Sequence, residues 1–237
     1  MNAIFDPDHF FDTIYCISIE ARRDRRDAAA AAFEKLGILA RVEFVLVQLH
    51  PTNREEGIFE SHMQCIHQGL EAGAQHILIF EDDLLIKNFK AEKIIDAIGF
   101  LQKNDGWDAF FLGAISRGSK KTVSRSVNKI EYRCLAHAYA LNRQFAASLV
   151  TESWVNIPFD DVLRQKCEKS YALSPMIAFQ STASSDNSTV FLDRLRRVFG
   201  GFPFVQRCNE LFQRYKIPVL CLHLLVFCVA ILLFIQR

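Results

Sequence analysis

The stretch HILIFEDDLLI, residues 76–86, joins an apolar run to three consecutive carboxylates. The run 76–80 consists almost entirely of Ile, Leu and Phe, which is typical of a strand whose two faces are both buried. Such strands occur in parallel sheets that helices cover on both sides. Ligands of open α/β sheets bind at the carboxyl ends of the strands, where Glu81, Asp82 and Asp83 stand. The stretch therefore predicts a helix-covered sheet with an acidic site at its edge.

Strand-like and helix-like segments alternate on both sides of this stretch. Runs rich in β-branched and aromatic residues predict strands, and apolar residues at helical spacing predict helices. The predicted strands are 12–19, 41–49, 76–80, 107–113 and 129–141, and the predicted helices are 21–37, 57–73, 91–103 and 142–154. The polar, basic residues 114–128 are expected to form a mobile loop. The alternation predicts one α/β domain with a mostly parallel sheet that extends to about residue 180.

The composition limits the partners of this chain of 237 residues. Its formal net charge is +1 and its pI is near 7.6, so it lacks the overall basic charge of a nucleic-acid-binding protein. The seven cysteines show no CxxC spacing, which predicts reduced thiols in a reducing compartment and no zinc site. The first residues carry Asp6, Asp8 and Asp12 rather than a basic region, so no secretory signal is expected.

Residues 217–235 form an apolar run without formal charge unless His223 is protonated. At about 1.5 Å per residue a helix of this length just crosses a bilayer core, which predicts a transmembrane or membrane-inserted helix; a buried core helix is the alternative. The basic, amphipathic linker 191–216 is typical of a segment at a headgroup layer, or of a helix packed on the domain. The basic excess before the run predicts a membrane-associated protein whose domain, 1–190, is cytoplasmic, at the inner membrane if the protein is bacterial.

Adjacent carboxylates repel one another unless a cation compensates their charge. In an extended chain Glu81 and Asp83 point to the same side, while Asp82 points away. Mg²⁺ and Mn²⁺ prefer oxygen ligands, and Mg²⁺ typically bridges one or two carboxylates and substrate phosphates. The pattern predicts such a metal site, with Asp83 as the best ligand, Glu81 as a second ligand or a donor contact, and Asp82 in reserve. A solvated turn or the cap of a following helix is the alternative.

Several further stretches occur in the order that one enzyme family uses. YCISIEARRDRR (15–26) joins a strand to an Arg-rich turn, and the pair Ser61-His62 precedes Glu-Asp-Asp by about twenty residues. DAFFLG, HAYALNRQFAASLV and IPFDDVLRQ follow. On these residues the chain resembles glycosyltransferase family 25, which includes bacterial lipooligosaccharide β-galactosyltransferases and animal collagen galactosyltransferases.

The resemblance implies a GT-A-like, Rossmann-like domain that transfers a hexose, galactose before glucose, from a UDP-sugar with inversion. It implies Mn²⁺ or Mg²⁺ as the cofactor and a lipooligosaccharide, glycolipid or oligosaccharide acceptor at the membrane. A protein acceptor is one alternative, and a catalytically inert membrane interaction module is another. Ser18, Ile58 and Glu60 differ from the residues common in the family, which bears on the donor contacts more than on the reaction class.

An inverting transfer needs a base to take the proton of the acceptor hydroxyl. Asp160 and Asp161 are the candidates for this role, and capping of the helix that follows them, or acceptor binding, is the alternative. The basic stretch at Arg117, Lys120, Lys121 and Arg125 would close over the diphosphate, face anionic lipid, or do neither.

The resemblance also implies a set of contacts to the sugar-nucleotide donor. The expected donor-binding residues are Ser18, Arg25, Ser61, His62, Glu81 and His137. Arg25 would pair with a donor phosphate, unless it lies on a solvated helix face. Ser61 and His62 would bind the donor or hold the acidic loop, and a structural role is the alternative for both histidines.

Overall fold

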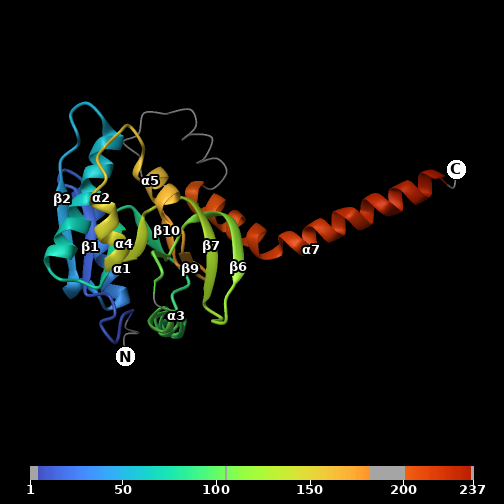
Figure 1. The fold of residues 1–237 in the computed structure, drawn as a ribbon, viewed down its shortest axis with the longest axis horizontal. Helices are drawn as coiled ribbons and strands as arrows, with labels where there is room; N and C mark the ends of the chain where they lie inside the picture. Colours follow the sequence, from blue (N-terminus) through green and yellow to red (C-terminus); the bar gives the residue numbers. More distant parts are fainter. Residues whose placement is uncertain (1–4, 105, 182–200, 236–237) are drawn as a thin grey trace.

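An eight-stranded mixed sheet forms the centre of the protein (Figure 1). The computed structural model describes residues 5–104, 106–181 and 201–235, without the side chains of 228–230 and 232–235. Its strand order is β2-β1-β3-β8-β5-β9-β7-β6. The bounds are Thr13–Ile19 (β1), Val42–Val47 (β2), His76–Glu81 (β3), Ala109–Phe111 (β5), Ile115–Lys121 (β6), Val127–Cys134 (β7), Ala138–Asn142 (β8) and Ser170–Leu173 (β9). Six strands run in one direction and β7 and β8 run against them, which confirms an α/β fold with a mostly parallel sheet.

Helices cover both faces of the sheet, as the uninterrupted apolar run of β3 predicts. Leu78 and Phe80 pack into one core cluster, and Ile77 and Ile79 pack into a second cluster on the opposite face. Buried residues of two helices complete the first cluster and those of three helices complete the second. These helices are α1 (Arg23–Leu36) and α3 (Ala91–Lys103) for the first, and α2 (Arg54–Glu71), α4 (Arg143–Leu149) and α5 (Phe159–Lys166) for the second.

A second, two-stranded sheet lies beside the end of β3. It consists of β4 (Leu84–Ile86) and β10 (Ala178–Gln180), which run antiparallel. The register pairs Leu84 with Gln180, and the N–H of Ser181 donates to the carbonyl of Asp83 at 2.6 Å. The turn after β3 is therefore fixed by a strand that comes almost a hundred positions later in the sequence.

The prediction of a mobile loop at 114–128 is wrong, because most of this stretch forms the hairpin of β6 and β7 at the edge of the sheet. The inward positions of β6 are Ser116 and Gly118, so the strand has no apolar alternation to reveal it. Its register with β7 shifts twice between Ile115 and Gly118. Its outer positions carry Arg and Lys, which suit an edge strand because charged side chains discourage pairing with another chain.

The C-terminal helix α7 (Gly201–Ile235) begins by covering the β6 edge. The carboxamide of Asn209 acts as a strand partner for Ser116, because it accepts the backbone N–H at 3.0 Å and donates to the carbonyl at 2.9 Å. Gln213 donates to the carbonyls of Ser116 and Arg117, and Gln206 donates to the carbonyl of Ala178 at 2.7 Å. These contacts satisfy backbone groups that an edge strand would otherwise leave open.

Beyond these contacts α7 projects from the domain as one continuous helix (Figure 1). The helix passes through the boundary predicted at 216/217, and Pro218 lies inside it. Of the predicted linker 191–216, the part 191–200 lies outside the described residues. The transmembrane helix predicted at 217–235 is not supported. Within the described part of the chain, no helix is both long and apolar enough to cross a membrane.

Candidate functional site

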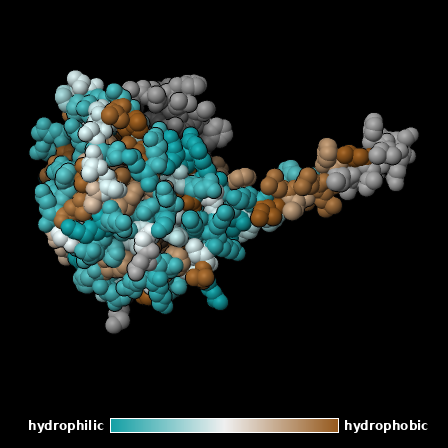
Figure 2. Space-filling view, viewed as in Figure 1, coloured by the Kyte–Doolittle hydropathy of each residue, from teal (hydrophilic) through white to brown (hydrophobic). Residues whose placement is uncertain are grey.

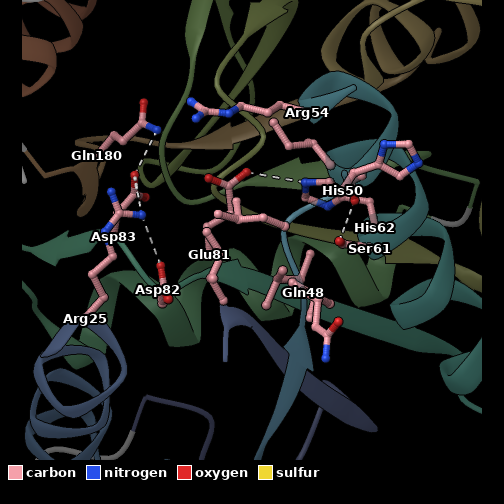
Figure 3. Close-up of a pocket in the computed structure, with 16 residues that line it drawn as sticks. Arg25, Gln48, His50, Arg54, Ser61, His62, Glu81, Asp82, Asp83 and Gln180 are labelled. Carbon is pink, nitrogen blue, oxygen red and sulfur yellow. Dashed lines mark hydrogen bonds and ion pairs between the residues drawn. The ribbon is translucent and has the colours of Figure 1, made fainter. Parts of the chain in front are cut away.

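A cavity of about 180 Å³ opens where the three parallel strands β2, β1 and β3 end (Figure 3). This is the edge at which the sequence predicts a ligand site. The cavity is lined from β1, α1, the end of β2 and its connection to α2, the first half of α2, the end of β3 with the turn after it, and β10. The lining residues are Ile17, Ile19, Arg25, Val47, Gln48, Leu49, His50, Arg54, Gly57, Ile58, Ser61, His62, Glu81, Asp82, Asp83 and Gln180.

Glu81 is the last residue of β3, and its carboxylate faces into the cavity toward His62 (Figure 3). Nε2 of His62 lies 3.3 Å from Oε1 of Glu81, and Nδ1 lies 2.9 Å from the hydroxyl of Tyr139. The imidazole is buried and stacks on Phe159 with ring centroids 4.2 Å apart. Burial lowers the pKa of His62 to about 3, so the ring is neutral at pH 7. With Glu81 ionised, Nε2–H donates to the carboxylate and Nδ1 accepts from Tyr139.

The burial of His62 gives the stability of the protein a defined pH dependence. The ordinary pKa of 6.5 applies in the unfolded chain, and the folded value is about 3. The folded state therefore disfavours protonation, and stability falls as the pH decreases from 6.5 toward 3. Between pH 7 and pH 5 we expect the unfolding free energy of wild type to fall by about 2 kcal/mol more than that of His62→Asn. Urea titrations between pH 7 and 5 measure this difference.

The exposed His67 on the same helix provides the control. His67→Asn should follow the wild-type pH dependence, because its ring is in water in both states. A His62→Asn variant that loses stability with acid as steeply as wild type would show that His62 is protonated in the folded protein.

The carboxylate of Asp82 is held by the first strand and the first helix. Ser18 donates to its Oδ2 at 2.7 Å, and Nη1 of Arg25 lies 3.4 Å from its Oδ1. Asp82 is only 5% exposed, and burial raises its pKa while the bonds from Ser18 and Arg25 act in the opposite direction. Ser18 thus positions Asp82 rather than facing the cavity, and Asp82 joins the end of β3 to β1 and α1.

Asp83 points toward the β10 side of the cavity (Figure 3). Its Oδ2 accepts from Nε2 of Gln180 at 3.1 Å and lies 4.0 Å from Nη1 of Arg25. Among the described residues, no donor reaches Oδ1 of Asp83 or bonds Oε1 of Gln180, although both atoms are buried. A buried oxygen acceptor without a donor, such as Oδ1 of Asp83, is what a cation or an ordered water would satisfy.

The three carboxylates do not converge in the way that an extended chain predicts. The strand ends at Glu81, and Asp82 and Asp83 form a turn before β4, so the alternation of sides stops there. Glu81 faces His62, Asp82 faces Ser18, and Asp83 faces Gln180. Burial raises the pKa of Glu81 well above its ordinary value, and the charges of Asp83, Asp160 and Asp82 add to this effect. The acidic residues thus lie close enough to repel, but not as one closed set of ligands.

The remaining predicted donor residues differ in their position. Ser61 lines the cavity, and its hydroxyl donates to the carbonyl of Gly57 within α2 at 2.5 Å. Arg25 lines the cavity from α1 and contacts both acidic residues of the turn. His137 is buried behind the turn, and its carbonyl accepts the N–H of Glu81 at 2.9 Å. Burial lowers the pKa of His137, while the nearby carboxylate of Asp83 acts in the opposite direction.

The two candidate bases lie in the first turn of α5, outside the cavity lining. Asp160 accepts from the hydroxyl of Tyr132 at 2.5 Å and from the backbone N–H groups of Leu135 and Ala136 at 3.0 Å each. Its carboxylate therefore fixes the connection between β7 and β8. Asp161 is partly exposed and pairs with Arg164 at 2.5 Å. The role of either residue as a base stays a prediction.

The cavity lining also includes Arg54, Gln180 and His50, which were not predicted from the sequence. Arg54 stands in the first turn of α2, and Figure 3 shows its guanidinium extending over Glu81. Its position directly after Asn53, which caps the helix, is the signal that could have identified it. Gln180 has no comparable local signal, because only the β4–β10 pairing brings it to Asp83.

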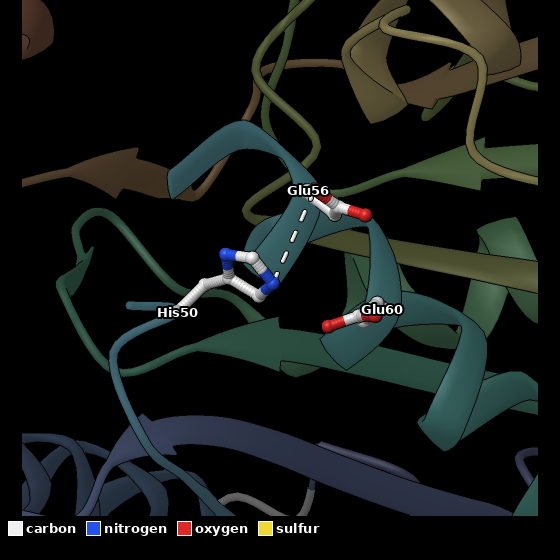
Figure 4. A group of neighbouring side chains, drawn as sticks. All are labelled: His50, Glu56 and Glu60. Carbon is white, nitrogen blue, oxygen red and sulfur yellow. Dashed lines mark ion pairs between the residues drawn. The ribbon is translucent and has the colours of Figure 1, made fainter. Parts of the chain in front are cut away.

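His50, the third of these residues, lies near Glu56 and Glu60 of α2 (Figure 4). In the described part of the chain this is the one group of at least three His, Cys, Asp or Glu side chains whose possible ligand atoms all lie within 4.8 Å of one another. However, Nδ1 of His50 accepts the N–H of Asn53 at 2.9 Å, so in the neutral ring the proton occupies Nε2, the atom that faces Glu56 at 4.0 Å. The group therefore fits a contact at the helix entry better than a metal site.

Comparison with solved structures shows distant similarity. No family model matches the chain. Similar solved structures include A197 from STIV, with 15% identity and a TM-score of 0.45 over 71% of this chain and 84% of that one. A glycosyltransferase involved in the glycosylation of the major capsid of PBCV-1 has 12% identity and a TM-score of 0.44 over 68% and 80%. Mannose-1-phosphate geranyltransferase from Thermus thermophilus has 10% identity and a TM-score of 0.43 over 68% and 72%. Values this low assign neither a family nor a reaction.

Proposed function

We propose that this chain is a glycosyltransferase that transfers a hexose from a UDP-sugar to an acceptor hydroxyl with the help of a divalent cation. One observation carries the proposal. Strand β3 delivers Glu81 and Asp83 to a cavity at the carboxyl ends of parallel strands, where His62, Arg25 and Arg54 also meet. The resemblance of several sequence stretches to glycosyltransferase family 25 supports the same activity, with galactose as the first sugar to test.

The residues around Asp83 fit a divalent cation. Oδ1 of Asp83 and Oε1 of Gln180 are buried oxygen acceptors without a donor among the described residues. Mg²⁺ is commonly held by one or two carboxylates together with substrate phosphates, so Asp83 need not be joined by Glu81 and Asp82. When bound, Mn²⁺ or Mg²⁺ would neutralise the negative charge that grows on the departing nucleotide. We therefore assign the cation to Asp83, with Gln180 beside it.

The other residues of the cavity would bind and orient the donor. Arg54 is exposed at the start of α2 and carries the positive charge that a diphosphate requires. Arg25 holds the turn at Asp82 and Asp83, so its charge also limits the repulsion between these residues. Glu81, oriented by His62, faces the cavity as an acceptor for the hydroxyl groups of the donor ribose or sugar. We thus propose charge neutralisation near Asp83 and hydroxyl recognition at Glu81.

The inverting step still needs a base within hydrogen-bond reach of the acceptor hydroxyl. Asp160 accepts three bonds from its own chain, so we assign it the positioning of the loop before β8. Asp161 is partly exposed and remains the candidate base, although its contact with Arg164 would have to yield to an acceptor. A glycolipid or lipooligosaccharide is the acceptor that the family resemblance favours, and a protein acceptor is the alternative.

Incubation of the full chain with individual UDP-sugars and Mn²⁺ tests the proposed function. We expect slow release of UDP from one UDP-hexose even without acceptor, and loss of this release when EDTA removes the cation. The nucleotide product is measured by a coupled assay or by chromatography. A chain that neither binds UDP nor hydrolyses any UDP-sugar would instead be an inert domain with this fold. Hydrolysis that continues in EDTA would contradict the metal but not the transferase.

A further inference from the structure

A second, larger cavity of about 710 Å³ lies at the opposite edge of the sheet, between the β6–β7 hairpin, the start of α3 and α7. It shares no lining residue with the cavity at Asp83. We call it the basic cavity, because six of its lining residues are cationic and none is acidic. The cationic residues are Lys93, Lys120, Lys121, Arg125, Arg214 and Lys216.

Ion pairs compensate little of the charge of the basic cavity, although Lys93 lies near enough to Asp96 to contribute, after the hydrogen bond from Ser124, to the lowered pKa of that carboxyl. Across the described residues, none of the six cations has an ion pair within 4.0 Å. The acidic Asp96 is turned to the hydroxyl of Ser124, which donates at 2.7 Å. Nζ of Lys216 lies 3.3 Å from Oε1 of Gln213, and Arg214 lies over the ring of Tyr215. In a chain whose net charge is only +1, this is a local concentration of positive charge.

The basic cavity directly adjoins the apolar surface of the protein. Its lining includes Ile217 and Pro218, the residues at which the apolar half of α7 begins. Ile217, Leu220 and Leu224 are 67%, 59% and 64% exposed, and Val123, also in the cavity lining, is 94% exposed. Figure 2 shows this projecting apolar segment next to the hydrophilic surface of the domain. Positive charge beside exposed apolar side chains matches the two parts of a phospholipid, a phosphate headgroup and its acyl chains.

We propose that the basic cavity binds the phosphate headgroups of anionic lipids at a membrane surface, while apolar side chains of α7 contact the acyl region. The cavity is at the β6 edge and the candidate donor site at the β2 edge, so these cations cannot close over the diphosphate of a donor bound there. The lipid site is independent of the proposed reaction. Release of UDP in solution needs no lipid, so either proposal can fail without the other.

Flotation of the full chain with vesicles tests this site. We expect binding to vesicles of phosphatidylcholine containing about one third phosphatidylserine, and weak binding to phosphatidylcholine alone. Lys120→Gln/Lys121→Gln should weaken binding to the anionic vesicles roughly 25-fold, because each cation near a charged surface contributes about fivefold. Raising the salt concentration to about 0.5 M should reduce wild-type binding by a similar factor, since the charges are then screened.

Lys35→Gln/Lys103→Gln is the matched control, because both side chains are exposed and lie outside the basic cavity. It should bind the anionic vesicles like wild type. Equal losses in the two double variants would overturn the site, since net charge alone would then explain the binding. Equal binding to neutral and anionic vesicles would also overturn it. So would saturable binding of inorganic phosphate without vesicle binding, or a helix-mediated dimer of the chain that ignores vesicles.

Discussion

Asp83→Asn is expected to lower metal-dependent turnover of the UDP-sugar by about 10²–10³-fold, the range found when one preorganised group that stabilises developing charge is removed. The variant keeps the size of the side chain, and its amide oxygen can still accept from Gln180. What it loses is the negative charge that would hold the cation beside Oδ1, an atom that no donor satisfies within the described chain. Rates measured over a Mn²⁺ titration should show a weaker metal dependence as well as a lower maximum.

Asp8→Asn provides the control for this variant, because Asp8 is exposed and lies at the N-terminal end of the described chain, away from the cavity lining. It should retain the wild-type rate and the wild-type metal dependence. Thermal unfolding of both variants should stay close to wild type, which separates a functional loss from a folding defect. Wild-type turnover by Asp83→Asn with an unchanged Mn²⁺ dependence would refute the assignment of the cation to Asp83.

Asp160→Asn is expected to lower the free energy of unfolding by about 2–4 kcal/mol, because donors that are buried around its carboxylate lose their acceptor. The hydroxyl of Tyr132 and the N–H groups of Leu135 and Ala136 all point at this side chain. An asparagine amide offers one oxygen and presents its own N–H₂ group to the remaining donors. Burial raises the pKa of Tyr132 well above its ordinary value, and Asp160 adds to this, so the phenol remains a donor.

The neighbouring Asp161→Asn variant supplies the comparison. Asp161 forms a partly exposed pair with Arg164, and such pairs contribute about 0–1 kcal/mol, so its stability should barely change. If Asp161 is the base, its turnover should fall by about 10²–10⁴-fold at unchanged stability. Urea unfolding and initial rates of both variants distinguish the two roles. An Asp160→Asn protein with wild-type stability and a rate loss of that size would reverse the assignment.

The same carboxylates illustrate how an acidic site is compatible with a folded domain. Glu81, Asp82 and Asp83 follow one another, yet each side chain finds a separate partner in His62, Ser18 or Gln180. Arg25 is the cation that contacts both residues of the turn. Burial raises the pKa of Glu81 well above its ordinary value, and the charges of the neighbouring carboxylates add to this effect. Sites that bind a charged ligand commonly keep groups with such shifted pKa values.

Local patterns in the sequence were sufficient for the frame of the fold. The apolar run of β3 predicted a strand covered on both faces, because only burial on both sides favours apolar residues at every position. The helix predicted from residue 142 onward begins there, because Asn142 caps α4 and its Oδ1 accepts the N–H of Phe145. Helix 91–103 was predicted with the bounds that the structure has. Each of these features depends on neighbours within a few positions, which is the range that periodicity and capping report.

The hairpin at 115–134 and the contacts of the acidic turn could not be read in this way. The inward side of β6 is made of Ser116 and Gly118, so no alternation marks it as a strand. The turn after β3 has its conformation from β10, which is remote in sequence, and that pairing alone places Gln180 at Asp83. From the sequence Asp160 could be a base, a helix cap or an acceptor contact, and the folded connection before β8 assigned it three donors.

By itself the sequence determined that an α/β sheet presents Glu81, Asp82 and Asp83 at the end of a buried strand, because side-chain burial repeats with the period of the local backbone. The tertiary structure alone decided which partner each carboxylate faces, and it alone gathered six cations from α3, the β6–β7 hairpin and α7 into one cavity. The physical reason is that such contacts arise from strand pairing and helix packing between distant segments. No local periodicity encodes these contacts.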